Sequence, residues 1–183
     1  SGLRAVRDEL RARMTPRQDS RVLHFASPSF DASVLEFLLA AAGSACLVIA
    51  PTDVYGGKPL AQFLTRNRVT HAFITPAAVA SMSPTDAPTL RCLAIGGEAF
   101  GADLARRWSA GRRILNVYGP TETTMCVTIS APLPAAPFNG QMRQPFLNVG
   151  IRVDHPQRGK PRHCRSCSTV AAQSRAPCRS RVS

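Results

Sequence analysis

Apolar positions along most of the chain recur with two different spacings. Leu3, Val6, Leu10 and Met14 are spaced like one face of a helix, and Pro16 ends this pattern. Short apolar runs typical of buried strands follow, and we expect strands at residues 21–26, 45–50, 70–75, 90–95, 113–117 and 125–130. Between these runs, helical spacing predicts helices at residues 32–42, 59–67, 76–82 and 102–108.

This order of elements predicts the fold class. Strands that alternate with short helices form crossover units, so we expect an α/β fold with a mostly parallel sheet and flanking helices. Asp31 lies at the start of the helix expected at 32–42, and Gly43 is expected to end it. Ligands of parallel sheets bind just beyond the carboxyl ends of the strands, so candidate site residues are expected there.

The pattern stops after Ile151, and the composition changes at the same place. Residues 152–183 contain no Phe, Tyr or Trp and are rich in Arg, Ser, Pro and Cys. Such a segment buries too little apolar surface to offset its ordering entropy. We therefore predict a globular part at 1–151 and a tail at 152–183 that is disordered or out of frame. Seven Arg and one Lys against one Asp give the tail +7 of the chain's net +12, so nucleic acid is not an expected partner of the globular part.

Cysteine content and the length of apolar runs exclude two classes of protein. Six Cys in a chain of 183 residues, without an opening signal sequence, do not indicate a secreted disulfide scaffold. The longest apolar stretch, residues 37–50, is interrupted by Gly43 and Ser44 and is short for a membrane span. The sequence predicts a cytoplasmic protein without a membrane partner.

Sequence motifs follow the strands expected in the first part of the chain. The string NVYGPTETT occupies residues 116–124, FDAS occupies 30–33 and LAIGGEA occupies 93–99. The first resembles the NxYGPTE signature of adenylate-forming (AMP-binding) enzymes, and the second resembles the FDxS motif of their amino-acid-activating branch. The third is similar to the GGEA turn beside the family's adenine pocket. Over about residues 1–151, the chain thus resembles the adenylation domain of non-ribosomal peptide synthetases.

The resemblance implies both a fold and an activity. The chain would be a fragment of the large N-terminal domain of the adenylate-forming fold. The intact domain would activate an amino acid with ATP to an aminoacyl-adenylate and release pyrophosphate. Its partners would be condensation and carrier domains of the parent synthetase, the carrier bearing phosphopantetheine.

Residues of the nucleotide site are implied by the same motifs. Glu122 would hold Mg²⁺ and Thr121 would hydrogen-bond the α-phosphate, and these two are the candidate catalytic residues. Tyr118 would offer its flat face to the adenine ring. The other residues expected to line ATP or AMP are Gly97, Glu98, Ala99, Asn116 and Gly119.

For the amino acid, the resemblance implies that Asp31 pairs with the α-ammonium group. Without the neighbouring motifs, Asp31 would be interpreted as a helix N-cap. The positions that correspond to the family's side-chain pocket are Ala32, Leu35, Phe73, Ala94, Gly96, Val117, Met125 and Cys126. None of them is charged, so we expect a substrate with a neutral, mainly apolar side chain.

Parts of the family's catalytic machinery have no counterpart in the sequence. The phosphate-binding loop would precede residue 1. Neither the YRTGDL-like segment nor the small domain with the catalytic Lys is recognisable after residue 151. Truncation or a frame change near residue 152 would account for this. The missing loop and Lys stabilise charge at the reacting phosphoryl group, so we expect the isolated chain to be inactive.

Other functions remain open at this point. A zinc or nucleic-acid module would use His163, Cys164, Cys167 and Cys178 of the tail. A non-catalytic remnant would keep the nucleotide crevice without the chemistry. A related acyl- or aryl-acid-activating enzyme is disfavoured, because its substrate would leave the Asp31 carboxylate unpaired.

Overall fold

The computed structural model describes residues 2–119, 128–130 and 132–133. By its internal contacts the chain divides into two units, Ser1–Val153 and Asp154–Ser183. The described residues all belong to the first unit, and the tail predicted at 152–183 lies outside them. No helix within the described ranges is long and apolar enough to cross a membrane.

The described residues form a mostly parallel sheet, as the sequence predicts. Its strands have the order β2-β1-β3-β4-β5-β6. The first five strands along the chain pair in parallel, and β6 pairs antiparallel with β5. In chain order they are β1 (Arg21–His24), β2 (Cys46–Ile49), β3 (His71–Ile74), β4 (Cys92–Gly96), β5 (Arg113–Tyr118) and β6 (Thr128–Ile129).

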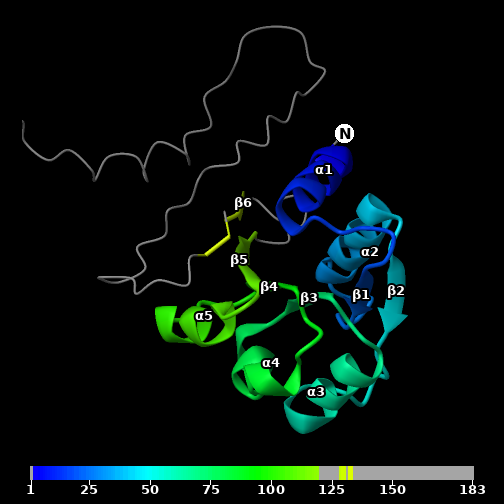
Figure 1. Cartoon of the computed structure of the whole chain (residues 1–183). Coiled ribbons are helices and arrows are strands. Elements are labelled where there is room, and N and C mark those ends of the chain that lie inside the picture. The colour runs from blue at the N-terminus through cyan, green and yellow to red at the C-terminus, as the bar shows by residue number, and fades with distance from the viewer. Residues whose placement is uncertain (1, 120–127, 131, 134–183) are drawn as a thin grey trace, which may run out of the picture. The chain divides into compact units, whose positions relative to one another are not determined.

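Helices cover both faces of this sheet (Figure 1). On one face, Val6 and Leu39 pack in a cluster with Val22 and Leu115 of the strands. On the other face, Leu60, Val79 and Trp108 pack in a second cluster with strand residues such as Ile95. The first face is covered by α1 (Gly2–Met14) and α2 (Ala32–Gly43), and the second by α3 (Gly57–Arg66), α4 (Pro76–Ala80) and α5 (Ala102–Ser109); a short 3₁₀ helix, η1 (Pro84–Asp86), follows α4.

Burial on both sides explains why the strands read as continuous apolar runs. In β4, Cys92 and Ala94 belong to the cluster under α2, while Leu93 and Ile95 belong to the opposite cluster. Successive side chains of a strand point to opposite faces, so a parallel sheet covered on both faces needs apolar residues at every position. All residues of β4 are buried accordingly.

The expected end of α2 is wrong by one residue. Gly43 remains helical, and Ser44 takes the left-handed conformation with φ of 51°. The backbone N–H of Ala45 then donates to the carbonyl oxygen of Ala40 at 2.9 Å. This hydrogen bond forms when the residue directly after the last helical one is left-handed, and that residue is Ser44.

The chain leaves the middle of the sheet in two directions, which creates a topological switch point. From β1 it runs through α2 to β2 on one side, whereas from β3 it runs through β4 to β5 on the other. Ligands of open α/β sheets bind at the carboxyl ends of the strands beside such a switch point. The segment between β1 and α2, which ends in Asp31, starts at this place.

Glu36 joins α2 to the end of β1 inside the core. The residue is only 1% exposed. Its carboxylate accepts hydrogen bonds from the backbone N–H groups of Phe25 and Ala26, each 3.1 Å at the closest, and its Oε2 lies 2.6 Å from Nδ1 of His24. Burial raises the pKa of Glu36 to about 7, although the backbone hydrogen bonds and His24 act in the opposite direction.

The pKa of Glu36 predicts a pH dependence of stability. Because its folded pKa lies above the unfolded value, the contribution of this group is fully present below pH 4.5 and is lost as pH rises through about 7. We expect the free energy of unfolding to fall by on the order of 1–3 kcal/mol across this window. Urea denaturation at pH 5 and pH 8 measures it. Glu36→Gln should flatten the dependence, whereas Glu9→Gln on the partly exposed helix α1 should keep it; an equally steep profile in Glu36→Gln would contradict the assignment.

At the end of β4, Gly96 allows a close approach of neighbouring chain segments. A Cβ atom at this position would collide with the carbonyl oxygen of Val117 and would lie 3.2 Å from the ring of Phe73. Gly96 pairs with Val117 in the β4–β5 ladder. A backbone carbonyl in a ladder cannot move aside as a flexible side chain can, so glycine is required here.

We expect Gly96→Ala to lower the free energy of unfolding by about 1–3 kcal/mol, because β4 and β5 must separate to admit the methyl group. Gly101→Ala is the matched control, since a Cβ there meets no atom within 4 Å. Thermal and urea denaturation compare the two variants. Equal losses would mean that the crowding at Gly96 is relieved without cost.

Candidate functional site

The carboxyl ends of β1, β3, β4 and β5 bring the predicted motifs to one edge of the sheet. These strands are parallel neighbours, so the segments that follow them lie at the same edge. Asp31 follows β1, residues 97–99 follow β4, and Gly119 follows Tyr118, the last residue of β5. Thr121 and Glu122, the two candidate catalytic residues, lie outside the described residues.

Asp31 directly precedes α2, but its side chain does not cap the helix. The residue is half-buried and has helical backbone angles, and no hydrogen bond joins its carboxylate to the first turn. Instead, the backbone carbonyl of Asp31 accepts from the N–H of Val34 at 2.9 Å. Oδ2 of Asp31 is buried and has no hydrogen-bond partner among the residues that the structure describes. The N-cap interpretation is therefore wrong for this side chain.

Most of the predicted side-chain pocket lies on the sheet face that α2 covers. Leu35, Ala94 and Val117 belong to one buried cluster, and Phe73 packs against it. Phe73 pairs with Ala94, and Gly96 pairs with Val117, so these positions are neighbours across three strands. Ala32 is the half-buried first residue of α2. Met125 and Cys126 lie outside the described residues.

The predicted nucleotide residues lie at the ends of β4 and β5. Gly97 has a φ of +93°, a conformation that glycine adopts without strain, and Glu98 and Ala99 are exposed. Tyr118 is 57% exposed and Gly119 is half-buried. The backbone of Asn116 is tied to the segment after β6, since its N–H donates to Oγ of Ser130 and its carbonyl accepts from the N–H of Ser130, both at 2.9 Å.

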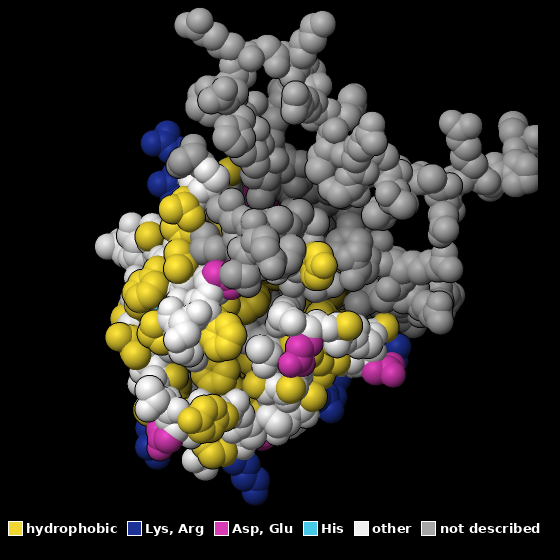
Figure 2. Space-filling view, turned by 180° about the vertical axis from the view of Figure 1, so that it is seen from behind, with side chains coloured by type: hydrophobic (Ala, Val, Ile, Leu, Met, Phe, Trp, Pro, Cys, Tyr) yellow, Lys and Arg dark blue, Asp and Glu magenta, His cyan; other side chains and the backbone are white. Residues whose placement is uncertain are grey.

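Exposed apolar side chains are distributed along this same edge. Phe30, Ile49, Tyr55 and Tyr118 are all more than half exposed. Each lies at the end of a parallel strand or in the segment that follows one. Figure 2 shows hydrophobic side chains spread over the described part of one face of the molecule.

Glu36 and His24 are residues of this region that the sequence motifs did not reveal. Ser33 was noted only as part of the FDAS string; it is 3% exposed, and its hydroxyl donates to the carbonyl oxygen of Phe30 at 2.7 Å. A signal for Glu36 is present in the sequence, because it is the only charged residue of a helix that is otherwise apolar apart from Ser33. A lone acidic residue on the core side of such a helix indicates a buried hydrogen-bonding role.

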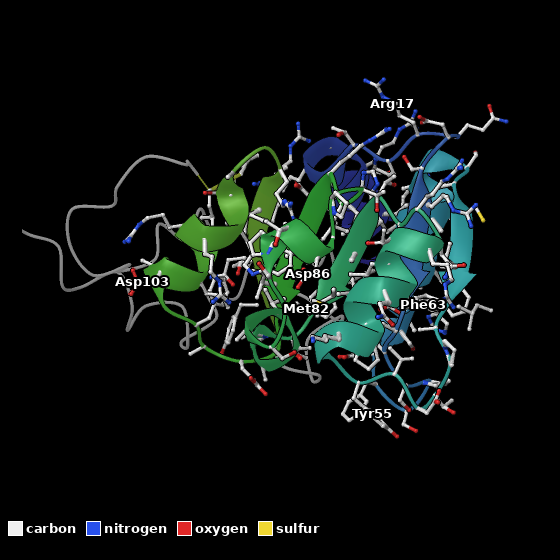
Figure 3. All side chains as sticks on the ribbon, turned by 60° about the horizontal axis from the view of Figure 1, so that its bottom comes forward. Arg17, Tyr55, Phe63, Met82, Asp86 and Asp103 are labelled. Atoms are coloured by element: carbon white, nitrogen blue, oxygen red, sulfur yellow. The ribbon has the colours of Figure 1, made fainter. Side chains whose placement is uncertain are left out.

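A cavity of about 610 Å³ lies at the opposite edge of the sheet. Its lining includes Arg17, Ser20, His71, Arg91 and Arg113, which lie at or just before the amino ends of strands. Figure 3 shows Arg17 and Tyr55 at opposite sides of the molecule. The described residues that line this cavity include none of the predicted site residues. Ligands of open α/β sheets bind at the carboxyl ends of the strands, so the carboxyl edge remains the candidate site despite the size of this cavity.

His71 faces this cavity but is committed to the fold. It is 4% exposed, with Nε2 at 3.1 Å from the carbonyl oxygen of Met14 and Nδ1 at 2.8 Å from Oγ1 of Thr70. Burial lowers its pKa, and the nearby Arg91 and Arg113 lower it further. These contacts give His71 a structural role in the packed sheet.

Within the described ranges, no three His, Cys, Asp or Glu side chains are grouped so that they could hold a metal ion. The predicted Mg²⁺ ligand, Glu122, lies outside these ranges, and so do His163, Cys164, Cys167 and Cys178 of the zinc alternative. The metal site therefore stays a prediction from the NVYGPTETT string.

Comparison with known proteins agrees with the motifs. The sequence model of one family, described as AMP-binding enzyme, matches residues 2–165. Novobiocin biosynthesis protein H of Streptomyces niveus is 49% identical over 133 residues, which are 73% of this chain and 22% of that protein. CymA of Salinispora arenicola, described as a "probable non-canonical nonribosomal peptide synthetase", is 47% identical over 135 residues, which are 72% of this chain and 2% of that protein.

A solved structure shows the same fold. The adenylation domain AlmE of Vibrio cholerae, crystallised with glycyl-adenosine-5′-phosphate, matches with a TM-score of 0.62 and 24% identity. The match covers 73% of this chain and 28% of that one. This chain thus spans under a third of each of these proteins. It belongs to the AMP-binding enzyme family and corresponds to a segment of the adenylation domains of nonribosomal peptide synthetases.

Proposed function

We propose that this chain supplies the amino-acid and adenine subsites of a domain that converts an amino acid and ATP into an aminoacyl-adenylate and pyrophosphate. In this reaction the carboxylate of the amino acid attacks the α-phosphorus atom, and pyrophosphate leaves. Family membership supports the reaction class. The observation that carries the assignment to an amino acid is the buried, unpaired Oδ2 of Asp31 at the switch point of the sheet.

Asp31 is suited to an α-ammonium group because its carboxylate is partly desolvated and its Oδ2 accepts no hydrogen bond from another described residue. A buried carboxylate oxygen without a partner is costly, and a cation that donates to it removes this cost. A charge-assisted hydrogen bond of this kind also fixes the orientation of the bound molecule. A carboxylic acid without an amino group would leave Asp31 unpaired, so the carboxylate selects for amino acids.

The nucleotide would bind along the ends of β4 and β5. Tyr118 would stack on the adenine ring, and the backbone around Gly97 and Asn116 would approach the nucleotide closely. Thr121 would donate a hydrogen bond to the α-phosphate. Glu122 would hold Mg²⁺, which when bound would neutralise phosphate charge. The exposure of Tyr118 supports this arrangement, since an aromatic face must be accessible before a base can stack on it.

The residues of the side-chain pocket support a neutral, mainly apolar substrate. Leu35, Phe73, Ala94 and Val117 share one apolar sheet face, where a charged side chain would be desolvated without a partner. By analogy with nonribosomal peptide synthetases, we propose that the product passes to the phosphopantetheine of a carrier domain and then to a condensation domain. We place the reaction in the cytoplasm, because it consumes ATP.

The adenine subsite is tested by Tyr118→Ala. We expect this change to weaken binding of AMP about 5-fold or more, because base–aromatic stacking is lost. Isothermal titration calorimetry on the full chain measures the affinity. Tyr55→Ala is the matched control, since Tyr55 is 78% exposed but follows β2 at the far end of the sheet. Equal effects of the two substitutions would place adenine elsewhere.

The role of Asp31 is tested with two stable adenylate analogues that differ only in the amino group. These are 5′-O-(glycylsulfamoyl)adenosine and 5′-O-(acetylsulfamoyl)adenosine, and neither requires knowledge of the natural side chain. We expect the chain to bind the glycyl analogue about 10-fold or more tighter, as for a hydrogen bond to a charged group. Asp31→Asn should bring the ratio of the two affinities close to one.

Asp53→Asn is the control for this measurement, because Asp53 is an exposed carboxylate in the segment after β2. It should leave the ratio unchanged. A ratio near one in the unsubstituted chain, together with AMP binding, would instead favour a nucleotide-binding remnant without amino-acid recognition. A chain that binds neither analogue would contradict the proposed function.

A further inference from the structure

The segment that carries Asp31 is held at both ends by hydrogen bonds. At its start, the backbone N–H groups of Phe25 and Ala26 donate to the carboxylate of Glu36. At its end, the carbonyl oxygen of Phe30 accepts from the hydroxyl of Ser33 at 2.7 Å and from its backbone N–H at 3.1 Å. The residues that hold this segment, Glu36 and Ser33, both belong to α2 and are almost fully buried.

Glu36 makes a hydrogen-bonded connection from α2 back to the end of β1. Its two carboxylate oxygens accept from two successive backbone N–H groups just beyond β1, and Oε2 also lies 2.6 Å from Nδ1 of His24, the last residue of β1. His24 is 11% exposed and its ring packs against Phe37 with 4.7 Å between ring centroids. The geometry of Glu36 thus determines where α2 starts relative to the end of β1.

Asp31 depends on this geometry, because no hydrogen bond to another described residue orients its side chain. Oδ2 is unpaired, and the side chain makes no cap contact. Its position follows from its backbone, whose carbonyl bonds to the first turn of α2. A functional group without its own hydrogen bonds is positioned by the residues that lock its backbone.

We propose that Glu36 is the positioning residue for Asp31: its buried carboxylate fixes the segment between β1 and α2 so that the Asp31 carboxylate meets the ammonium group of the amino acid. Glu36 itself touches neither substrate nor nucleotide. This inference rests on the proposed function for the role of Asp31. It adds Glu36 as a core residue that affects recognition of the amino group through the position of Asp31.

The test is the affinity ratio of the glycyl and acetyl analogues in the Glu36→Gln variant of the full chain. Gln has the size of Glu, but it replaces an acceptor oxygen with an NH₂ group that faces the donors of Phe25, Ala26 or His24. We expect the ratio to fall about 10-fold, toward one, while the affinity for the acetyl analogue stays within about 2-fold of the unsubstituted chain. A merely structural loss would weaken both analogues equally and leave the ratio unchanged.

Two further variants complete the design. Glu9→Gln makes the same chemical change on α1, where Glu9 accepts from Arg13 at 2.7 Å, and it should leave the ratio unaltered. The double variant Asp31→Asn with Glu36→Gln should lose no more of the ratio than Asp31→Asn alone, because the two residues act through one contact. Additive losses would overturn the proposal.

The outcomes separate the two claims. If Asp31→Asn abolishes the ratio and Glu36→Gln preserves it, the proposed function stands and the positioning role is overturned.

If the unsubstituted chain binds neither analogue, the proposed function fails, and amide hydrogen exchange followed by NMR decides the positioning claim without ligand. In Glu36→Gln, the amides of Phe25 and Ala26 should then exchange about 10-fold faster or more while those of β4 stay unchanged. Unaltered exchange at Phe25 and Ala26 would overturn the proposal.

Discussion

The parallel pairing of β1, β3, β4 and β5 is the constraint on which the candidate site depends. Parallel strands end at the same edge, so three segments far apart in the sequence meet where Asp31, Gly97 and Tyr118 lie. Parallel strands also require cover on both faces, which α1 and α2 provide on one side and α3, α4 and α5 on the other (Figure 1). The same two-sided packing that stabilises the sheet therefore brings the motifs together.

Two carboxylates near the end of β1 have opposite hydrogen-bonding situations. Glu36 is buried, and its oxygens accept from two backbone N–H groups beside His24. Asp31 is half-buried, and its Oδ2 has no hydrogen-bond partner in the described ranges. Burial of a carboxylate is costly in both cases, and the hydrogen bonds of Glu36 offset only part of that cost, since burial still raises its pKa to about 7. The unpaired carboxylate is the one that an external cation can satisfy, and the paired one makes the surrounding backbone rigid.

Most of the sheet and its helices could be predicted from the chain pattern, because apolar spacing reports burial directly. The strands at 21–24, 46–49, 71–74 and 113–118 fall on predicted runs, and α1 follows the spacing of Leu3 to Met14. Element ends were less accurate, as at Ser44, because the last helical turn is closed by backbone hydrogen bonds that no side-chain pattern encodes. The antiparallel direction of β6 also had no signal, since strand direction depends on the path of the connection.

By itself, the sequence determined the fold class, the family and the identity of the candidate site residues, because periodicity and motif strings are local properties of the chain. Only the tertiary structure decided how these residues are arranged. It showed that Asp31 does not cap α2, that Phe73, Ala94, Gly96 and Val117 are neighbours on one sheet face, and that Glu36 bonds back to the end of β1. These facts depend on burial and on hydrogen bonds between segments distant in the chain, and such contacts exist only once the strands are paired and the helices are packed.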